Sequence, residues 1–396
     1  MTARPDLAER LSRAPHGSGP LPGFLAHLPD AERRAGGSVP QWHLDLRLAS
    51  GEAIELTAPP GALPARRARD LVLRAVHPAA LRPGILDDCL TPAVARLQAV
   101  ALASLAPPNV LQVGTPNGAR VAVVVPLYRN LRFLRFQVAA FARDPDFRAN
   151  ARLVFVLDSP EQQAEVEHLL HGLHAVHGLP VTLVVMAENA GYAPACNAGA
   201  TAVGEGSYVL LLNSDVVPEA PGWLAALRRP MERDPGILAT GPKLLFDDGS
   251  VQHAGLFFLR HGPEGDWLNG HYAKGLSRRH PAANRAGPVP GLTGAALLLR
   301  RSAFDAVGGL CTDYVVGDYE DSDLCLRLRA LGGDIRYVPS AELYHFERQS
   351  IAGHAGYART LACAYNRRLH HRRWDGAIEA LMARFPAAGG RTTRAA

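Results

Sequence analysis

Lysine is almost absent from this 396-residue chain: Lys243 and Lys274 are the only two, so arginine carries the basic charge. The net charge of +5 at pH 7 is too small and too dispersed to indicate a nucleic-acid-binding protein. Mild basicity still suits anionic partners such as nucleotide diphosphates and lipid phosphates. We therefore expect no nucleic-acid partner.

Long apolar runs are missing as well. No stretch approaches the roughly 20 apolar residues that a membrane-spanning helix needs, and the N-terminus lacks the positive-then-apolar pattern of a signal peptide. The five cysteines are scattered without a CxxC spacing, which argues against a disulfide framework and against a zinc site. These absences predict a cytoplasmic protein whose contact with the inner face of the plasma membrane is at most peripheral.

Changes in composition and periodicity divide the chain. Alternating apolar residues over 42–48 and 53–57, joined by a turn, predict a β-hairpin. Residues 68–76 and 93–105 have the apolar spacing of helices. The parts that we expect are a flexible leader (1–38), a small α+β accessory domain of unknown role (39–115), an α/β domain (116–350), C-terminal basic helices (351–386) and a disordered tail (387–396).

In the α/β domain, short apolar runs alternate with helical stretches. The runs over 120–126, 151–158, 181–186 and 208–212 predict strands that are buried on both faces. Strands and helices that alternate at this spacing predict a doubly wound, mostly parallel sheet. The polar segment 261–290, rich in Gly, His and Arg, predicts a mobile loop.

The predicted strand Tyr208–Leu212 ends abruptly in Asn213-Ser214-Asp215. This polar end should lie at the carboxyl edge of the sheet, where open α/β sheets bind ligands. A carboxylate there can hold a divalent cation, and the cation can hold a diphosphate. Taken alone, these polar residues are better explained as the cap of a turn.

A series of short motifs along the α/β domain changes that balance. In chain order they are Val124-Val125-Pro126-Leu127-Tyr128, Asn189-Ala190-Gly191-Tyr192 with Asn197-Ala198-Gly199, Leu211-Leu212-Asn213-Ser214-Asp215, Gly249–Gly255, Thr293-Gly294-Ala295-Ala296, Val307-Gly308-Gly309, Tyr319–Arg327 and Tyr344-His345. With these motifs in this order, residues 119–350 resemble a family-2 glycosyltransferase with the GT-A fold. The resemblance is to the bacterial type that builds surface polysaccharides and O-antigens.

The resemblance implies a metal-dependent, inverting transfer of a sugar from a nucleotide sugar to a hydroxyl of a glycan or lipid-linked acceptor. It makes Asp215 a ligand of Mg²⁺ or Mn²⁺, and it lets His345 complete the metal shell or contact the diphosphate. Asn213 stands where relatives usually carry the first Asp of a DxD motif. It would either touch ribose or only shape the turn.

The resemblance also places a set of residues around a donor linked to UDP, dTDP or GDP: Pro126, Tyr128, Asp158, Asn189, Gly191, Asn197 and Asn213. Local chemistry leaves two alternatives open. Asp158 precedes Pro160, so it is also a good helix N-cap. Asn197 is also explained as a brace of its loop.

Glu320-Asp321 opens a predicted helix. By analogy with the family, Asp321 is the general base that takes the proton of the acceptor, and Glu320 is its neighbour in the catalytic pair. Helical geometry directs Asp321 and Asp323 to different faces. We therefore assign Asp323 to the favourable interaction of acids with a helix N-terminus, and Arg327 to an ion pair within the helix.

Four further interpretations complete the expectations. A nucleotidyltransferase would share the sheet and the metal carboxylate, but residues 127–130 lack the expected glycine-rich loop. A non-catalytic scaffold does not explain why Asp215, Glu320, Asp321 and His345 occur together. The basic run Tyr365–Trp374 predicts a solvated helix face, with attraction to anionic lipid headgroups as the alternative. His253 is expected to shape a loop or to contact the acceptor.

Overall fold

The computed structural model describes residues 43–47, 53–57, 63–76, 78, 84–116, 119–204, 206–262, 265–346 and 360–385. The chain forms two compact units, Met1–Ala101 and Leu102–Ala396. The leader expected at 1–38 and the tail expected at 387–396 lie outside the described residues.

The first unit contains the predicted hairpin. Strand β1 (His43–Arg47) pairs antiparallel with β2 (Ala53–Thr57). Helix α2 (Ala65–Ala75) is followed by a π-helical turn, η3 (Leu86–Leu90), and by α3 (Thr91–Ala103). The guanidinium of Arg69 on α2 donates a hydrogen bond to the side chain of Gln98 on α3, so the two helices are joined by a buried polar contact.

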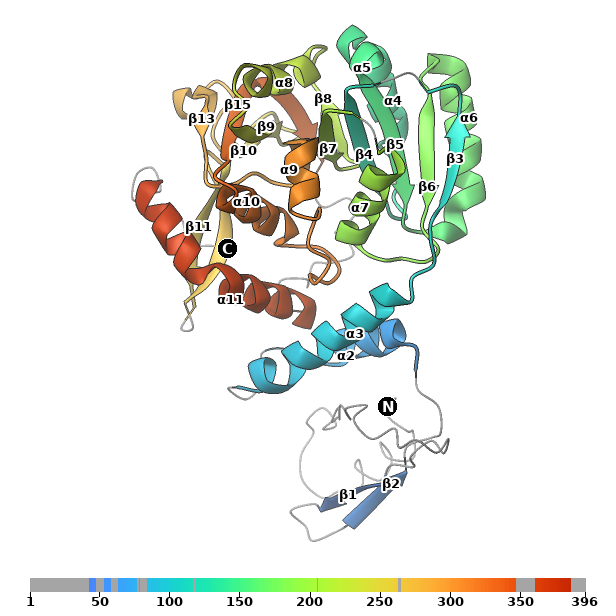
Figure 1. Cartoon of the computed structure of the whole chain (residues 1–396), viewed down its shortest axis with the longest axis vertical. Coiled ribbons are helices and arrows are strands. Elements are labelled where there is room, and N and C mark those ends of the chain that lie inside the picture. Colours follow the sequence, from blue (N-terminus) through green and yellow to red (C-terminus); the bar gives the residue numbers. More distant parts are fainter. Residues whose placement is uncertain are drawn as a thin grey trace. The chain divides into compact units, whose positions relative to one another are not determined.

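The second unit is built on an eleven-stranded mixed sheet with the order β13-β15-β9-β14-β7-β4-β5-β6-β3, to which β10 adds on β9 and β8 on β15 (Figure 1). Its strands are β3 (Asn109–Val113), β4 (Val121–Leu127), β5 (Ala151–Leu157), β6 (Val181–Val185), β7 (Tyr208–Leu212), β8 (Val216–Pro218), β9 (Ile237–Leu245), β10 (Val251–His253), β13 (Gly287–Pro288), β14 (Ala296–Arg300) and β15 (Asp334–His345). Strands β11 (Leu256–His261) and β12 (Asp266–His271) form a separate hairpin.

Strands β6, β5, β4 and β7 are parallel to one another, which confirms the doubly wound core. Alternate residues of β4 pack on opposite faces: Val123 and Val125 join one apolar cluster, and Ala122 and Val124 join the other. Because both faces are covered, these strands read as continuous apolar runs in the sequence.

Helices cover both faces of the sheet (Figure 1). Those on one face are α4 (Leu134–Ala142), α5 (Pro145–Asn150), α6 (Gln163–His177) and α8 (Trp223–Arg233); those on the other are α7 (Tyr192–Ala202), α9 (Arg301–Ala306) and α10 (Glu320–Ala330). Short 3₁₀ turns are η4 (Pro160–Gln162) and η5 (Pro281–Asn284).

The last described helix, α11 (Leu361–Arg384), packs on the β11–β12 hairpin and on α10 through a small apolar cluster. The cluster contains Phe258, Trp267, Leu326, Ile378 and Leu381. Among the described residues, no helix combines the length and the apolar character needed to cross a bilayer.

The structure differs from the sequence-based expectations in two places. Strand β3 joins the main sheet beside β6, so the second unit begins at Leu102, before the expected boundary at 115/116. The segment 261–290, expected as a loop, contains β12, η5 and β13. Its polar residues are compatible with strands because β12 and β13 lie at the periphery, each paired with one neighbour.

Strand β8 fixes the chain just after Asp215. It pairs antiparallel with the end of β15, so that Val216 lies opposite His345. The backbone N–H of Phe346 donates to the carbonyl of Asp215 (3.1 Å), and the Phe346 ring stacks on Phe133 with 4.8 Å between centroids. The pairing therefore brings His345 next to Asp215 across 130 positions of sequence.

Gln137 on α4 stabilises the turn between β7 and β8. Its side chain is fully buried, and its amide nitrogen donates to the carbonyls of Asn213 (2.9 Å) and Val216 (2.8 Å). One buried amide thus satisfies two carbonyls of the turn that carries Asp215.

Gln137→Leu should lower the free energy of unfolding by about 1–3 kcal/mol, because two carbonyls of the turn lose their side-chain donor. Urea denaturation should show a lower midpoint with an unchanged m-value. Arg135→Leu, an exposed position on the same helix, is the control and should change the free energy by less than about 0.5 kcal/mol. Equal losses in both variants would contradict this role for Gln137.

Candidate active site

The loops after β4 and β5 meet at the carboxyl edge of the sheet. Pro126 near the end of β4 lies opposite Val156 of β5, and the backbone N–H of Asp158 donates to the carbonyl of Leu127 (2.8 Å). Tyr128 follows with 43% of its surface exposed, and the guanidinium of Arg129 lies 5.1 Å from its ring centroid. Pro126, Tyr128 and Asp158 are therefore brought together at one edge.

Asp158 is buried, and both of its carboxylate oxygens accept backbone hydrogen bonds. The N–H groups of Ala190 (2.7 Å) and Gly191 (2.9 Å) donate to them. The turn after Asp158 has Ser159 at its N-cap, without a side-chain capping bond. The carboxylate thus ties the loop after β5 to the loop after β6, a role that differs from the helix cap given as the alternative to base binding.

The loop Asn189–Gly191 leads directly into α7. Gly191 has a φ of +96°, in the left-handed region that favours glycine, and a Cβ there would lie 3.4 Å from the carbonyl of Val316. Asn189 beside it is half-buried. The loop thus lies close to the segment that precedes Glu320.

Asn197 belongs to the fold. Its side-chain oxygen accepts from the N–H of Leu310 (2.9 Å), and its side-chain nitrogen donates to the carbonyl of the same residue (2.8 Å). The amide is engaged at both ends and braces α7 against residues 309–310. We therefore remove Asn197 from the nucleotide-binding set and keep the alternative, a structural brace.

Asp215 and His345 face each other at the ends of β7 and β15. Both side chains are largely buried, and His345 Nε2 lies 3.4 Å from Asp215 Oδ1. Asn213 is half-buried, and its backbone N–H donates to the carbonyl of Ala295 (2.9 Å). Within the described part of the chain, the side-chain amide of Asn213 makes no hydrogen bond, so it is available to a ligand.

Gln252, which the sequence did not single out, sets the orientation of His345. Its amide nitrogen donates to the carbonyl of His345 (3.3 Å), so its amide oxygen faces His345 Nδ1 at 2.6 Å. Nδ1 must then carry a hydrogen, and the neutral ring keeps its lone pair on Nε2. That lone pair points at a carboxylate oxygen, and two acceptors face each other stably only with a proton or a cation between them.

His253, two residues before Gly255, is buried in β10. Its Nδ1 lies 2.8 Å from Nδ1 of His271, so one ring donates and the other accepts. Burial lowers the pKa of His253 well below its usual value and that of His271 to about 4. The pair is therefore neutral and serves the β10–β12 packing, which matches the structural alternative for His253.

Strained backbone precedes the two candidate catalytic carboxylates. Val316, Asp318 and Tyr319 have φ angles of +67°, +134° and +71°. Such conformations are costly for non-glycine residues and cluster at functional sites. The Glu320 carboxylate accepts the backbone N–H of Asp318 (2.5 Å) and so helps to hold the segment in this shape.

Burial shifts the pKa of all three acids in this segment upward. It raises the pKa of Asp318 to about 7 and also raises that of Glu320, with the neighbouring Asp321 charge as a second cause. Burial also raises the pKa of Asp321, against the lowering effect of its hydrogen bonds from Gly294 and Ser322. Carboxyl groups shifted in this direction are suited to accept protons near neutral pH.

Asp321 is joined to the nucleotide side through Gly294. The N–H of Gly294 donates to Asp321 Oδ2 (2.8 Å), and the Tyr192 hydroxyl donates to the carbonyl of Gly294 (2.9 Å). A Cβ on residue 294 would come within 3.0 Å of the Tyr192 hydroxyl, so a larger residue would press on that hydroxyl. Tyr192 and Gly294 are site residues that sequence patterns alone did not assign.

Asp323 has a structural role, as expected. It is 1% exposed and accepts hydrogen bonds from Tyr314 (3.2 Å), Trp374 (2.8 Å) and Arg327 (2.7 Å). Arg327 forms the predicted ion pair within α10 and also donates to the carbonyls of Val307 and Gly309. Through Trp374, Asp323 ties α11 to the helix that carries Asp321.

The basic run of α11 is partly packed against its neighbours: Arg372 and Arg373 are exposed, and its other basic side chains are half-buried or buried. Arg367 and Arg368 form ion pairs with Asp266, and Arg373 pairs with Asp313. His370 is fully buried and lies 3.1 Å from the Ser322 hydroxyl. The expected solvated face is therefore largely an interface with β12 and α10.

The donor set at Asp215 and His345 suits a divalent cation. A carboxylate oxygen and an imidazole lone pair are both metal ligands, and the second nitrogen of the imidazole has the outer partner that metal-binding histidines usually have. No group of three or more His, Cys, Asp or Glu side chains that could hold a metal occurs in the described ranges. The protein would thus supply two ligands, and phosphate oxygens and water the remainder.

Comparison with known proteins agrees with this chemistry. The family described as "Glycosyltransferase like family 2" matches residues 116–362. An uncharacterized protein, y4gI, of Sinorhizobium fredii is 37% identical over 159 residues, which cover 39% of this chain and 17% of that protein. The O-antigen biosynthesis protein RfbC of Myxococcus xanthus is 32% identical over 161 residues, covering 40% and 12%.

An N-acetylglucosaminyl-diphospho-decaprenol L-rhamnosyltransferase of Mycobacterium tuberculosis is 32% identical over 192 residues, covering 43% of this chain and 60% of that protein. The chain thus spans less than two thirds of each of these relatives. Among solved structures, the mannosyltransferase PcManGT of Pyrobaculum calidifontis has a TM-score of 0.45 and 19% identity, covering 76% of this chain and 84% of that chain. Because the family match covers more than half of its residues, the chain belongs to the family-2 glycosyltransferases and has their GT-A fold.

Proposed function

We propose that this protein transfers a sugar from a nucleotide-sugar donor to a hydroxyl of a glycan or lipid-linked acceptor, with a divalent cation bound. One observation carries the proposal. The turn that bears Asp215 and the helix that bears Asp321 are joined at consecutive residues: Ala295 accepts from Asn213 N (2.9 Å), and Gly294 N donates to Asp321 (2.8 Å). These two hydrogen bonds would hold the candidate metal ligand Asp215 and the half-buried candidate base Asp321 in a fixed relation.

The donor would be linked to UDP, dTDP or GDP. Pro126, Tyr128, Asn189 and the Asp158-tethered loop form the edge on which its base and ribose would lie, and Asn213 offers an unused amide to the ribose. The names of the relatives support a role in cell-surface polysaccharide synthesis, with an acceptor carried on a lipid diphosphate. Five free cysteines agree with work in the cytoplasm, at the inner face of the plasma membrane.

Asp215 and His345 would hold Mg²⁺ or Mn²⁺. When bound, the cation neutralises charge on the diphosphate that leaves with the nucleotide. The chain's own contribution is orientation: Gln252 fixes the His345 ring, and the β8–β15 pairing fixes the separation of the two ligands. Asp215 and His345 thus present oxygen and nitrogen lone pairs to one point.

Asp321 would be the general base. It is half-buried, whereas its neighbour Glu320 is 6% exposed, so Asp321 is the carboxylate that an acceptor hydroxyl can reach. The acceptor oxygen would bond to the anomeric carbon as its proton passes to Asp321 and the carbon–phosphate-oxygen bond breaks. A single displacement of this kind inverts the anomeric configuration.

Asp215→Asn and His345→Ala should each weaken Mn²⁺ binding by about tenfold or more, because each removes one of two protein ligands. Gln252→Leu should weaken it by roughly 10–100-fold, because the orienting partner of His345 is lost. Gln252→Glu keeps an acceptor at Nδ1 and should retain binding. Electron paramagnetic resonance of free Mn²⁺ gives the affinity without any donor or turnover.

The Gln252 pair of variants decides the orienting role. If Gln252→Leu and Gln252→Glu bind Mn²⁺ alike, the side chain does not set the His345 ring. If Asp215→Asn leaves the affinity unchanged, the metal assignment is wrong.

Asp321→Asn should reduce turnover of the preferred donor by about 10²–10⁴-fold, because the acceptor proton loses its base. Donor binding, measured by thermal shift with UDP, dTDP and GDP sugars, should stay within about twofold of wild type. Asp305→Asn, an exposed carboxylate on α9, is the control and should retain activity. Full activity of Asp321→Asn would refute the assignment.

Glu320→Gln should stabilise the protein increasingly as pH rises. Folding raises the Glu320 pKa, so the stability it contributes is complete below its unfolded pKa of about 4.3 and is lost as pH rises through the folded value. Glutamine avoids that loss. The stability difference between variant and wild type, from urea denaturation, should grow by on the order of 2 kcal/mol between about pH 4 and pH 8.5.

The exposed Glu161→Gln is the matched control for this pH series. Its stability difference from wild type should stay flat across the same range. If the stability difference for Glu320→Gln is also independent of pH, then burial does not destabilise the charged form of the Glu320 carboxylate.

A further inference from the structure

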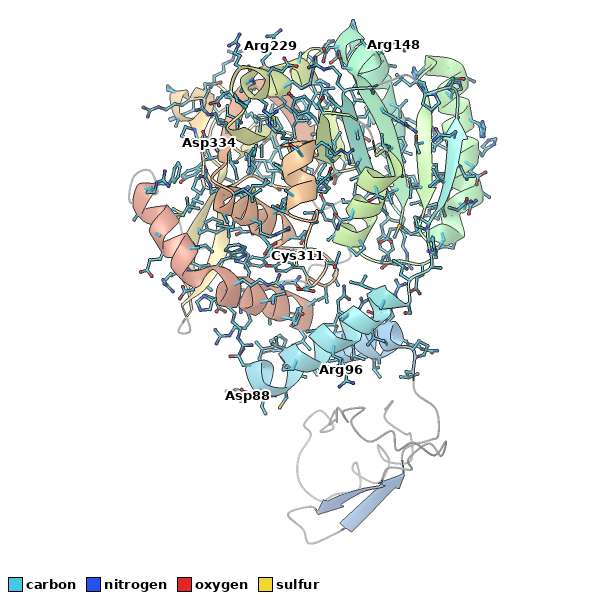
Figure 2. The ribbon with its side chains drawn as sticks, in the orientation of Figure 1. Asp88, Arg96, Arg148, Arg229, Cys311 and Asp334 are labelled. Carbon is cyan, nitrogen blue, oxygen red and sulfur yellow. The ribbon has the colours of Figure 1, made fainter. Side chains whose placement is uncertain are left out.

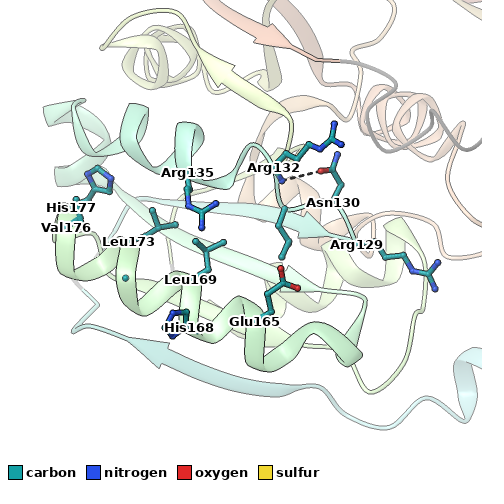
Figure 3. Close-up of a pocket in the computed structure, with 12 residues that line it drawn as sticks. Arg129, Asn130, Arg132, Arg135, Glu165, His168, Leu169, Leu173, Val176 and His177 are labelled. Atoms are coloured by element: carbon teal, nitrogen blue, oxygen red, sulfur yellow. Dashed lines mark hydrogen bonds between the residues drawn. The ribbon is translucent and has the colours of Figure 1, made fainter.

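A hollow of about 790 Å³ lies between α4 and α6 (Figure 3). None of the carboxylates of the candidate active site (Asp158, Asp215, Glu320 and Asp321) lines it. Its lining is Arg129, Asn130, Leu131, Arg132, Arg135, Glu165, His168, Leu169, Gly172, Leu173, Val176 and His177. The α6 members recur at intervals of three and four, so they form one face of that helix. Apart from Arg129, whose guanidinium lies over the Tyr128 ring, the site described above uses none of these side chains.

The rim of the hollow is basic and largely unneutralised. Arg129 has a weak, exposed contact with Glu161 (3.7 Å), whereas Arg132 and Arg135 have no ion-pair partner in the described ranges. Glu165 is the single acidic side chain of the lining. Figure 3 shows Arg135 directed from α4 toward Leu169 on α6.

The floor and the surroundings are apolar. Leu131, Leu169 and Leu173 line the hollow, and two large side chains stand exposed beside it: Val176 is 76% exposed and Phe136 is 65% exposed. Phe136 follows Arg135 on α4, so an exposed aromatic ring lies within one helical turn of that arginine. Arginines next to exposed apolar groups are the composition of surfaces that enter the headgroup region of a bilayer.

We propose that this hollow is the surface through which the protein docks on anionic phospholipids. A phospholipid presents phosphate and apolar glycerol together and so matches the basic rim and the apolar floor. A free phosphate ion would leave that floor in water. Three arginines of α11, the helix that the sequence offered for the same task, are paired with acids: Arg367 and Arg368 with Asp266, and Arg373 with Asp313.

The position of the hollow suits an enzyme whose acceptor is lipid-linked. Arg129 follows β4, and its backbone N–H donates to the Ser159 hydroxyl (3.2 Å), next to Asp158. The docking surface therefore begins at the loops that form the nucleotide edge. Vesicle binding itself needs neither donor nor metal, so the proposal can fail while the proposed sugar transfer stands.

The test is co-sedimentation of the full chain with vesicles. We expect binding to vesicles of phosphatidylglycerol and phosphatidylcholine, loss of that binding at about 0.5 M salt, and none to phosphatidylcholine alone. Arg132→Gln with Arg135→Gln should lower the partition constant roughly 25-fold, about fivefold for each arginine. Arg229→Gln with Arg233→Gln removes the same charge from exposed positions on α8, where Arg229 points away from the ribbon (Figure 2), and should change it less than twofold.

Gly172 allows a second test that keeps every arginine. A Cβ at this position meets nothing within 4 Å, and replacing glycine inside a helix favours the helix. Gly172→Glu should therefore fold, place a carboxylate in the hollow and weaken vesicle binding at least fivefold, whereas Gly172→Gln should bind like wild type. Circular dichroism melting checks that both variants are folded.

Three outcomes would overturn the proposal. They are equal binding to neutral and anionic vesicles, equal loss in the α8 control, and no binding to either vesicle. Displacement by inorganic phosphate at constant ionic strength would also overturn it, because it would identify a discrete anion site in place of a membrane-docking surface.

Discussion

The antiparallel pairing of β8 with the end of β15 is the constraint on which the metal-binding edge depends. Strand β8 is only three residues long, yet it fixes Val216 opposite His345 and leaves Asp215 bonded to Phe346. Two side chains separated by 130 positions of sequence thereby face each other at 3.4 Å. The turn before β8 is held equally specifically, because the buried amide of Gln137 donates hydrogen bonds to two of its carbonyls.

A second set of contacts makes the two halves of the site one unit. Asp158 holds Ala190 and Gly191, the next residue Tyr192 reaches Gly294, and Gly294 holds Asp321. Val316, the first of the strained residues, lies against Gly191, and the segment that it begins carries the chain into α10. On the far side of α10, Asp323 fastens α11. Polar contacts thus hold the helix that carries the candidate base on two sides, through Asp321 and through Asp323.

The sequence predicted the parts of this arrangement that are locally encoded. Strands β4 to β7 were predicted correctly because strands that are buried on both faces appear in the sequence as short apolar runs. Asp215 could be singled out because it comes just after the end of one of these strands. Helix α7 begins at Tyr192 and carries Pro194 in its first turn, where a proline is tolerated. Gln252, Tyr192 and the partners of the α11 arginines were beyond prediction, because each depends on contacts between segments distant in sequence.

The tether at Asp158 has a consequence for how variants of this protein are interpreted. Both carboxylate oxygens already hold backbone N–H groups, so removing the carboxylate frees the entry to α7 before it affects any base. The Tyr192 hydroxyl would lose its fixed place against Gly294, and the disturbance would reach the frame of Asp321. A loss of selectivity among donors in such a variant would therefore report disorder of a loop. In steady-state assays this loss of selectivity would look like altered recognition of the nucleotide base. Its cause would be changed geometry on the acceptor side, around Asp321.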